Sequence, residues 1–118
     1  LQIVHRFHQP MANAAGGINS NIHDLIKWVT ARLNGGKYGD HLQYRLFSEK
    51  ENREMFSPQT ILPVYSKGIY HTHFKAYGLG WFMKDVRGYK EIYHSGGLSG
   101  MVTHICMIPE LKLGIIVL

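Results

Sequence analysis

One stretch of the chain combines residue types that can act on a substrate. Between an apolar strand that ends near Tyr93 and an apolar run that starts at Met101, the sequence reads His94-Ser-Gly-Gly-Leu-Ser-Gly100. Two residues are enough to join two strands, and glycine costs chain entropy when it is ordered. Clustered glycines beside polar side chains suit a place where backbone N–H groups approach a ligand. A longer glycine-rich loop between two strands is the alternative interpretation.

Metal, carboxylate and phosphate chemistry have no comparable pattern. The eight histidines include two close pairs, His5-x-x-His8 and His71-x-His73, and neither has a cysteine or carboxylate at a zinc-ligand spacing. The eight Asp and Glu residues are dispersed, so no carboxylate pair for glycoside hydrolysis can be located. No Gly-x-x-x-x-Gly-Lys-Ser/Thr phosphate loop occurs. The sequence therefore predicts no metal site and no cofactor.

The composition is that of an ordinary globular chain with a positive net charge. Its 118 residues, 45% hydrophobic and 18% charged, amount to one domain at most. The thirteen Lys and Arg residues scatter from Arg6 to Lys112 without a basic helix face, which argues against nucleic-acid binding. No apolar run approaches the ~18 residues of a membrane span. The single cysteine, Cys106, is interpreted as a small buried hydrophobe.

Two helices are predicted in the first half of the chain. The first has one apolar stripe at helical spacing, made of Ile22, Leu25, Ile26, Val29 and Leu33. One of residues 19–21 can cap it, and Asn34-Gly-Gly36 can end it. Ser48-Glu-Lys-Glu51 matches a capping box, which predicts a short helix from about Glu49 to Phe56. Residues 57–75 have no clean period and are expected to form a long surface excursion.

The second half of the chain predicts strands. Apolar runs cover residues 77–84, 89–94, 101–108 and 114–118, with short connections between them. Short connections imply an antiparallel meander, and helices followed by strands without alternation imply the α+β class. We therefore expect an antiparallel β-meander packed with helices.

Four pieces of the sequence, in this order, resemble the C-terminal part of the serine β-lactamase-like family. They are Ala15-Gly-Gly-Ile-Asn-Ser20 before a helix with Asp24-Leu-Ile-Lys-Trp28, then Tyr77-Gly-Leu-Gly-Trp81, then His94-Ser-Gly-Gly-Leu-Ser-Gly100, and finally Pro109 before Leu113-Gly-Ile-Ile-Val-Leu118. That family includes class C β-lactamases, D-alanyl-D-alanine carboxypeptidases, which are penicillin-binding proteins, and esterases. The resemblance implies a fragment of the β-lactamase/transpeptidase-like fold. It also implies export or a periplasmic location, since members are commonly exported.

The resemblance assigns roles to the glycine-rich stretch. His94-Ser95-Gly96 matches the family's third motif, Lys-Thr-Gly or His-Thr/Ser-Gly. By this resemblance His94 assists charge and proton balance near the nucleophile, and Ser95 hydrogen-bonds the substrate carboxylate or carbonyl flank. The backbone N–H of Gly97 supplies one oxyanion donor, and glycine at positions 96 and 97 leaves room for a small-molecule or peptide substrate.

The nucleophile motifs of the family are absent from these 118 residues. No serine has a lysine three residues later, and no tyrosine has an asparagine two residues later. The expected parent is a serine hydrolase acting on amide, β-lactam or ester bonds through an acyl-enzyme, and this chain alone is expected to be inactive. The alternative is a non-catalytic penicillin-binding-like module that binds peptidoglycan-type ligands or a protein partner.

The two ends of the chain lead to further expectations. The chain starts at Leu1 and stops inside an apolar run, so we expect residues 1–118 to be the C-terminal segment of one β-lactamase-like domain. Residues 113–118 would then lack a strand partner and would expose an apolar edge. Self-association through residues 113–118 is one outcome, and cover by the apolar residues 1–7 is the other.

Overall fold

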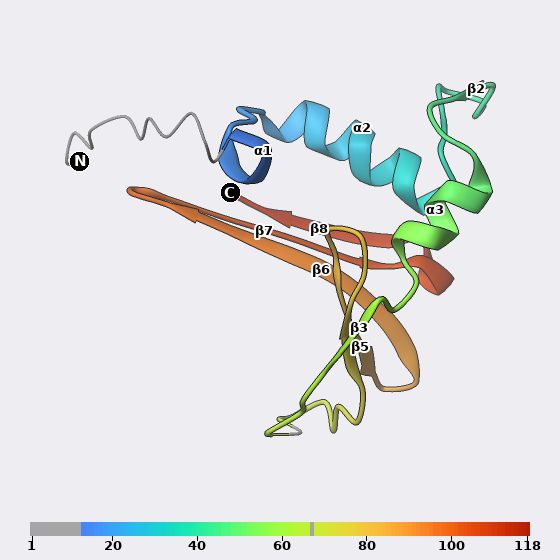
Figure 1. Ribbon diagram of the computed structural model, residues 1–118. Coiled ribbons are helices and arrows are strands. Elements are labelled where there is room, and N and C mark those ends of the chain that lie inside the picture. Colours follow the sequence, from blue (N-terminus) through green and yellow to red (C-terminus); the bar gives the residue numbers. More distant parts are fainter. Residues whose placement is uncertain (1–12, 67) are drawn as a thin grey trace.

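The computed structural model describes residues 13–66 and 68–118, in which helices come first and a sheet follows (Figure 1). The helices are α1 (Asn13–Gly16), α2 (Ile22–Leu33) and α3 (Glu49–Met55), with a 3₁₀ turn, η2, at Pro109–Leu111. The six strands of the sheet are β3 (Thr60–Leu62), β4 (Lys75–Tyr77), β5 (Phe82–Val86), β6 (Tyr89–Leu98), β7 (Met101–Ile108) and β8 (Leu113–Val117). They pair antiparallel in chain order, which confirms the predicted α+β class and meander.

Both predicted helices form, and each has the caps that the sequence indicates. Asn21 caps α2 by accepting a hydrogen bond from the Asp24 N–H at 3.1 Å. At the other end Gly35 adopts φ +63°, and the Gly36 N–H donates to the Ala31 carbonyl at 2.8 Å, as in a Schellman motif. The capping box of α3 is complete in both directions.

The apolar stripe of α2 is only half covered. Val29 and Leu33 are buried, whereas Ile22 is 39% and Ile26 50% exposed. Strand β8 packs under the helix, and a Cβ added at Gly114 would lie 2.5 Å from Val29 Cγ1. The helix and the strand can therefore approach this closely only because position 114 has no side chain.

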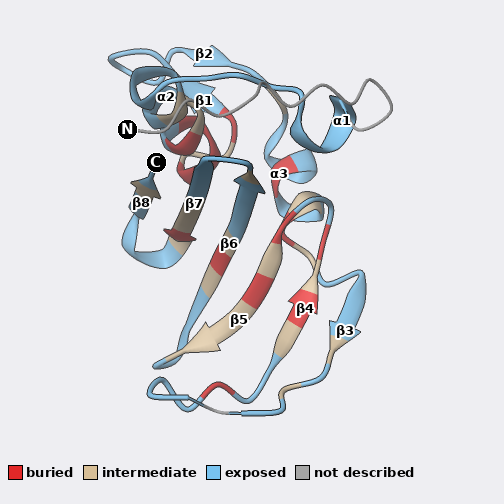
Figure 2. Ribbon diagram, turned by 90° about the vertical axis from the view of Figure 1, so that its left-hand side faces the viewer, coloured by how far each residue is buried: buried red, intermediate tan, exposed pale blue. Residues whose placement is uncertain are grey.

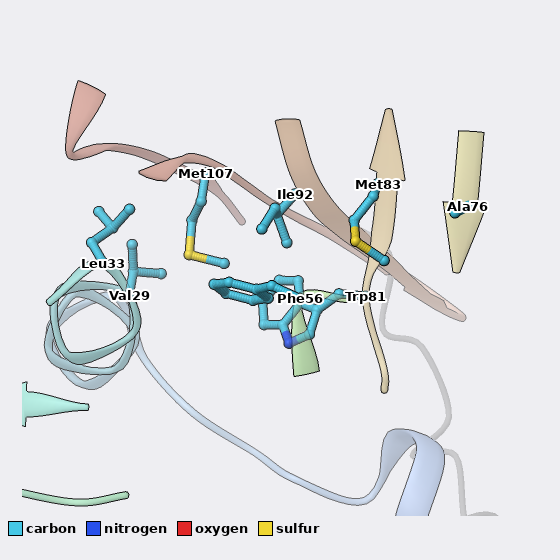
Figure 3. Close-up of a cluster of buried hydrophobic side chains, with 8 residues drawn as sticks. All are labelled: Val29, Leu33, Phe56, Ala76, Trp81, Met83, Ile92 and Met107. Atoms are coloured by element: carbon cyan, nitrogen blue, oxygen red, sulfur yellow. The ribbon is translucent and has the colours of Figure 1, made fainter. Parts of the chain in front are cut away.

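The core lies on the helix side of the sheet (Figures 2 and 3). It consists of Val29, Leu33, Phe56, Ala76, Trp81, Met83, Ile92 and Met107. Figure 3 shows the rings of Phe56 and Trp81 next to the strand residues Met83, Ile92 and Met107. Each strand from β4 to β7 contributes one of these side chains, so the core fixes the register of the sheet.

Arg32 is the one cation in the described chain that is almost fully buried, with 1% of its surface exposed. Its guanidinium carbon lies 4.4 Å from the ring centre of Phe56, 4.9 Å from Phe47 and 5.9 Å from Trp81. Burial lowers the pKa of Arg32 to about 10, so the group keeps its charge at neutral pH. The aromatic rings stabilise that charge through cation–π contacts.

The region between α3 and β5 differs from the prediction. Residues 57–75 are not a plain surface excursion, because β3 lies within them and pairs with β4. The predicted single strand over residues 77–84 is broken by a turn in which the Gly78 N–H donates to the Trp81 carbonyl at 2.8 Å. Gly80 has φ +82° in this turn, a conformation that other residues rarely adopt.

The glycine-rich stretch is not the longer loop of the alternative interpretation, and the strand runs beyond the predicted residues 89–94. Strand β6 continues through Gly96 and Gly97 to Leu98, and only Ser99 and Gly100 form the turn to β7. Glycine lacks a side chain but keeps its backbone groups, so pairing with β7 is enough to hold it in a strand.

The expectation that residues 113–118 lack a strand partner is wrong for one side of β8. Strand β7 pairs with it over five positions, from His104↔Val117 to Ile108↔Leu113. The other side of β8 has no partner strand among the described residues. The proposed cover by residues 1–7 lies outside the described part of the chain. The chain also contains a hairpin of β1 (Lys37–Tyr38) and β2 (Tyr44–Arg45), which was not predicted.

We predict that Gly114→Ala destabilises the chain by about 1–3 kcal/mol, because the added methyl overlaps Val29. Gly97→Ala is the matched control, since a Cβ there meets nothing within 4 Å. Denaturant unfolding of both variants measures the difference. Equal stability of the two would contradict the close packing of α2 on β8.

Candidate functional site

Strand β6 has neighbours of unequal length. Its pairing with β5 ends at Phe82↔Tyr93, whereas its pairing with β7 continues to Leu98↔Met101. Residues 96–98 of β6 and 101–103 of β7 form a two-stranded arm that reaches toward α1, because β8 pairs with β7 only from His104 onward (Figure 1). From residue 94 onward, β6 therefore has a strand partner on one side only, within the described residues.

The two hairpins that flank β6 show which backbone groups face the open side. In a two-residue hairpin the two residues beside the turn donate to and accept from each other. Along each strand, the side to which the backbone N–H and C=O point then alternates from residue to residue. Counting from Leu98 at the Ser99–Gly100 turn, the even-numbered residues of β6 face β7. Counting from Tyr89 at the other hairpin, the odd-numbered residues face β5. Both counts direct the N–H and C=O of Ser95 and Gly97 to the side where β5 has ended.

A cavity of about 500 Å³ lies between this arm and the segment before α2. Residues 14–16 and 18–20 line one side, and Gly96, Gly97, Leu98, Met101 and Thr103 line the other. The described lining is mostly apolar and contains no charged side chain. Two stretches that are about eighty positions apart in the sequence, both important to the family resemblance, thus share one cavity.

His94 is exposed at the base of the arm and has a partner that sequence reasoning missed. Its Nε2 lies 3.3 Å from the hydroxyl of Tyr77, at hydrogen-bond distance. The ring of Phe82 is 5.5 Å from the imidazole, centre to centre. Tyr77 is the first residue of the Tyr-Gly-Leu-Gly-Trp motif in the family resemblance. This motif was the one sequence feature that could have pointed to Tyr77 as part of the site.

Ser95 is also exposed, and its hydroxyl lies 2.9 Å from Nδ1 of His104 on β7. The two residues are direct cross-strand partners, so their side chains share a face of the sheet. Neither lines the cavity, which lies along Gly96, Leu98 and their partners. The structure therefore places the Ser95 backbone at the open edge and its side chain beside His104. Sequence reasoning missed His104 because no motif includes it.

The two glycines differ in the space around them. A Cβ at Gly96 would meet Thr103 Oγ1 at 2.7 Å, so the absence of a side chain lets the arm pack against its own threonine. A Cβ at Gly97 would meet nothing within 4 Å. At Gly97 the space that a side chain would occupy is therefore open.

The face that carries Ser95 and His104 continues into a shielded ion pair. Lys84 Nζ lies 3.2 Å from Glu91 Oε1, and the two side chains are only 25% and 12% exposed. Burial and the neighbouring Glu91 carboxylate raise the pKa of the Cys106 thiol to about 11. Cys106 is half-buried rather than buried as predicted, and it stays a protonated thiol at neutral pH.

Within residues 13–66 and 68–118, no three His, Cys, Asp or Glu side chains gather as metal ligands. No helix in this part of the chain is long and apolar enough to cross a membrane.

Comparisons with known proteins agree on one family. The family model described as Beta-lactamase matches residues 3–118. The chain is 30% identical over 109 residues to an unguisins hydrolase of Aspergillus campestris, and this match covers 92% of the chain and 18% of the relative. It is 29% identical to an unguisins hydrolase of Aspergillus violaceofuscus, covering 92% of the chain and 20% of the relative. The chain thus spans about a fifth of the length of these relatives. No solved structure matches significantly.

Proposed function

Because the chain belongs to the β-lactamase family, we propose that it forms one wall of the active site of a serine hydrolase. The reaction would cleave an amide, β-lactam or ester bond through an acyl-enzyme. The observation that carries this proposal is the open side of β6, where the Gly97 N–H points past the end of β5 and a side chain at position 97 would meet nothing within 4 Å. The hydrolase names of both relatives favour turnover over the alternative of a non-catalytic binding module.

The Gly97 N–H is proposed to be one of two donors that stabilise the oxyanion. When a nucleophile attacks a carbonyl carbon, the carbonyl oxygen becomes negative and needs donors that are already in place. Pairing with β7 holds this part of β6, so the donor need not reorganise during the reaction. One such donor contributes about 3 kcal/mol to stabilising the transition state.

His94 and Ser95 are proposed to serve the same site from the base of the open edge. The Tyr77 hydroxyl restrains the imidazole of His94, which can then accept or release a proton near the nucleophile. Ser95 offers its backbone groups along the edge and its hydroxyl beside it, so that an extended substrate can be held in line with Gly97. The apolar cavity along Gly96 and Leu98 would receive a substrate side chain.

The nucleophile is proposed to come from sequence outside residues 1–118. None of the six serines has the Ser-x-x-Lys spacing, and neither Ser95 nor His94 replaces it in this proposal. In the proposed arrangement these 118 residues form the C-terminal segment of a single β-lactamase-like domain. The segment alone lacks turnover because it has no group that forms the acyl-enzyme.

We predict that Gly97→Pro lowers kcat about 10²–10³-fold, because it removes one oxyanion donor. The measurement uses a longer polypeptide that contains residues 1–118 and the segment that supplies the Ser-x-x-Lys motif. Proline removes the backbone N–H and is tolerated where a strand has no partner on that side. Gly97→Ala keeps the N–H and is the matched control. Hydrolysis of a chromogenic cephalosporin and of a nitrophenyl ester measures both variants.

Wild-type rates in Gly97→Pro would remove Gly97 from the oxyanion site. Absence of turnover in the complete wild-type polypeptide would instead favour the binding module. A stoichiometric acyl adduct on Ser95 of the isolated chain, detected by mass spectrometry, would overturn the assignment of the nucleophile to another segment.

We further propose that the isolated chain self-associates through residues 113–118. The side of β8 opposite β7 presents backbone groups with no partner in the described residues. Leu113, Ile115 and Val117 are 44%, 49% and 55% exposed, and this segment contains no charge and no proline. Pairing with β8 of a second copy would satisfy the backbone and cover apolar surface at once.

The prediction is that the mass of the isolated chain in light scattering rises with concentration, and that Ile115→Lys keeps it monomeric. A charge on an open strand discourages edge pairing. Leu79→Lys is the control, because Leu79 is 51% exposed but lies in the turn before β5. A wild-type chain that stays monomeric at all concentrations contradicts the proposal.

A further inference from the structure

Beyond the roles that the family resemblance supplies, we propose that His104 is a positioning residue that orients the hydroxyl of Ser95. The inference rests on the proposed function in one respect, namely that Ser95 contacts the substrate. The geometry on which it is built is independent of that function. It starts from the contact between Ser95 Oγ and His104 Nδ1, which are 2.9 Å apart.

The hydroxyl of Ser95 has few other restraints. Ser95 is exposed, it lies where β6 has lost its β5 neighbour, and no other hydrogen bond of its side chain is found within the described residues. An exposed serine side chain can occupy three staggered rotamers. A hydrogen bond to a fixed cross-strand partner selects one of them.

His104 is suited to be that fixed partner. It is half-buried, whereas Ser95 is exposed. The ring of Tyr93 lies 6.1 Å from the imidazole, and Val117 of β8 is the cross-strand neighbour on the other side. The imidazole is therefore held between two strands, and it can transmit its orientation to Ser95.

The contact also determines whether the Ser95 hydroxyl can donate a hydrogen bond to a ligand or accept one from it. A hydroxyl has one proton and two lone pairs, and a neutral imidazole nitrogen without a proton is an acceptor. In our proposal Ser95 donates its proton to Nδ1, which leaves its lone pairs to accept from a ligand. The ligand group that fits is an N–H or O–H donor, as in a peptide-type amide, which differs from the carboxylate or carbonyl that the family resemblance implies for Ser95.

Backbone geometry at the same place favours the same class of ligand. The outward N–H and C=O groups of Ser95 and Gly97 form a short open strand edge. An extended peptide can pair with such an edge, because it carries both donors and acceptors at strand spacing. His104 thus completes a polar edge that matches an amide-containing chain.

The direct test is NMR on the isolated 118-residue chain. In the wild type, the two Hα–Hβ couplings of Ser95 should be unequal, as for a single rotamer, and the ¹⁵N shift of His104 Nδ1 should be that of an unprotonated nitrogen. His104→Phe should average the couplings. His104→Asn places an amide group near the position of Nδ1 and should restore unequal couplings. His41→Phe, at an exposed histidine between β1 and β2, is the control and should change nothing at Ser95.

Averaged couplings in the wild type, or unchanged couplings in His104→Phe, would overturn the positioning role. A proton on Nδ1 at neutral pH would overturn the assignment of Ser95 as the donor in this contact.

A second readout links the contact to the proposed function. In the complete hydrolase, His104→Phe should raise KM about five-fold and leave kcat within about two-fold, the worth of one net hydrogen bond. The change should vanish when Ser95 is already alanine. An equal effect of His104→Phe in the Ser95→Ala background would overturn the proposal. A complete polypeptide without any turnover would refute the proposed function, and the NMR couplings would still decide the role of His104.

Discussion

The point at which β5 begins determines the rest of the candidate site. Strand β6 forms five residue pairs with β5 and seven with β7, so one of its sides is left open for the last part of its length. Strand β5 starts at Phe82 because the turn from β4 ends there: the Gly78 N–H donates to the Trp81 carbonyl at 2.8 Å, and Gly80 has φ +82°. The buried ring of Trp81, which packs 5.9 Å from Phe56, centre to centre, anchors this turn in the core.

Arg32 connects that aromatic side chain to the helices. Its guanidinium lies near rings from α2, from the segment before α3, from the residue after α3 and from the residue before β5. Among residues 13–66 and 68–118 no carboxylate pairs with this buried cation. Its loss of hydration lowers the pKa of Arg32 to about 10. The aromatic faces offset part of the loss, and they bring elements that are distant in the sequence to one place. The open edge of β6 therefore depends on packing on the helix side of the sheet.

Local signals made the helices predictable from the sequence, whereas the ends of the strands depend on partners. Asn21 and the Ser48–Glu51 capping box act within one turn of chain, so their pattern is sufficient. The continuation of β6 through Gly96 and Gly97 depends on β7, and glycine suggested a loop. The partner of β8 was likewise missed, although the meander itself was predicted. The polar partners Tyr77 and His104 come from other strands, so residue spacing along β6 could not reveal them.

Amide hydrogen exchange along β6 shows directly whether one side of this strand is open. We expect the amides of Gly96 and Leu98, which face β7, to exchange slowly and those of Ser95 and Gly97 to exchange fast. The amide of Tyr93, which faces β5, should be slow and should mark the last protected odd-numbered position. Equal protection of all residues from 93 to 98, or slow exchange at Gly97 with fast exchange at Gly96, would contradict an open edge that offers the Gly97 N–H to a ligand.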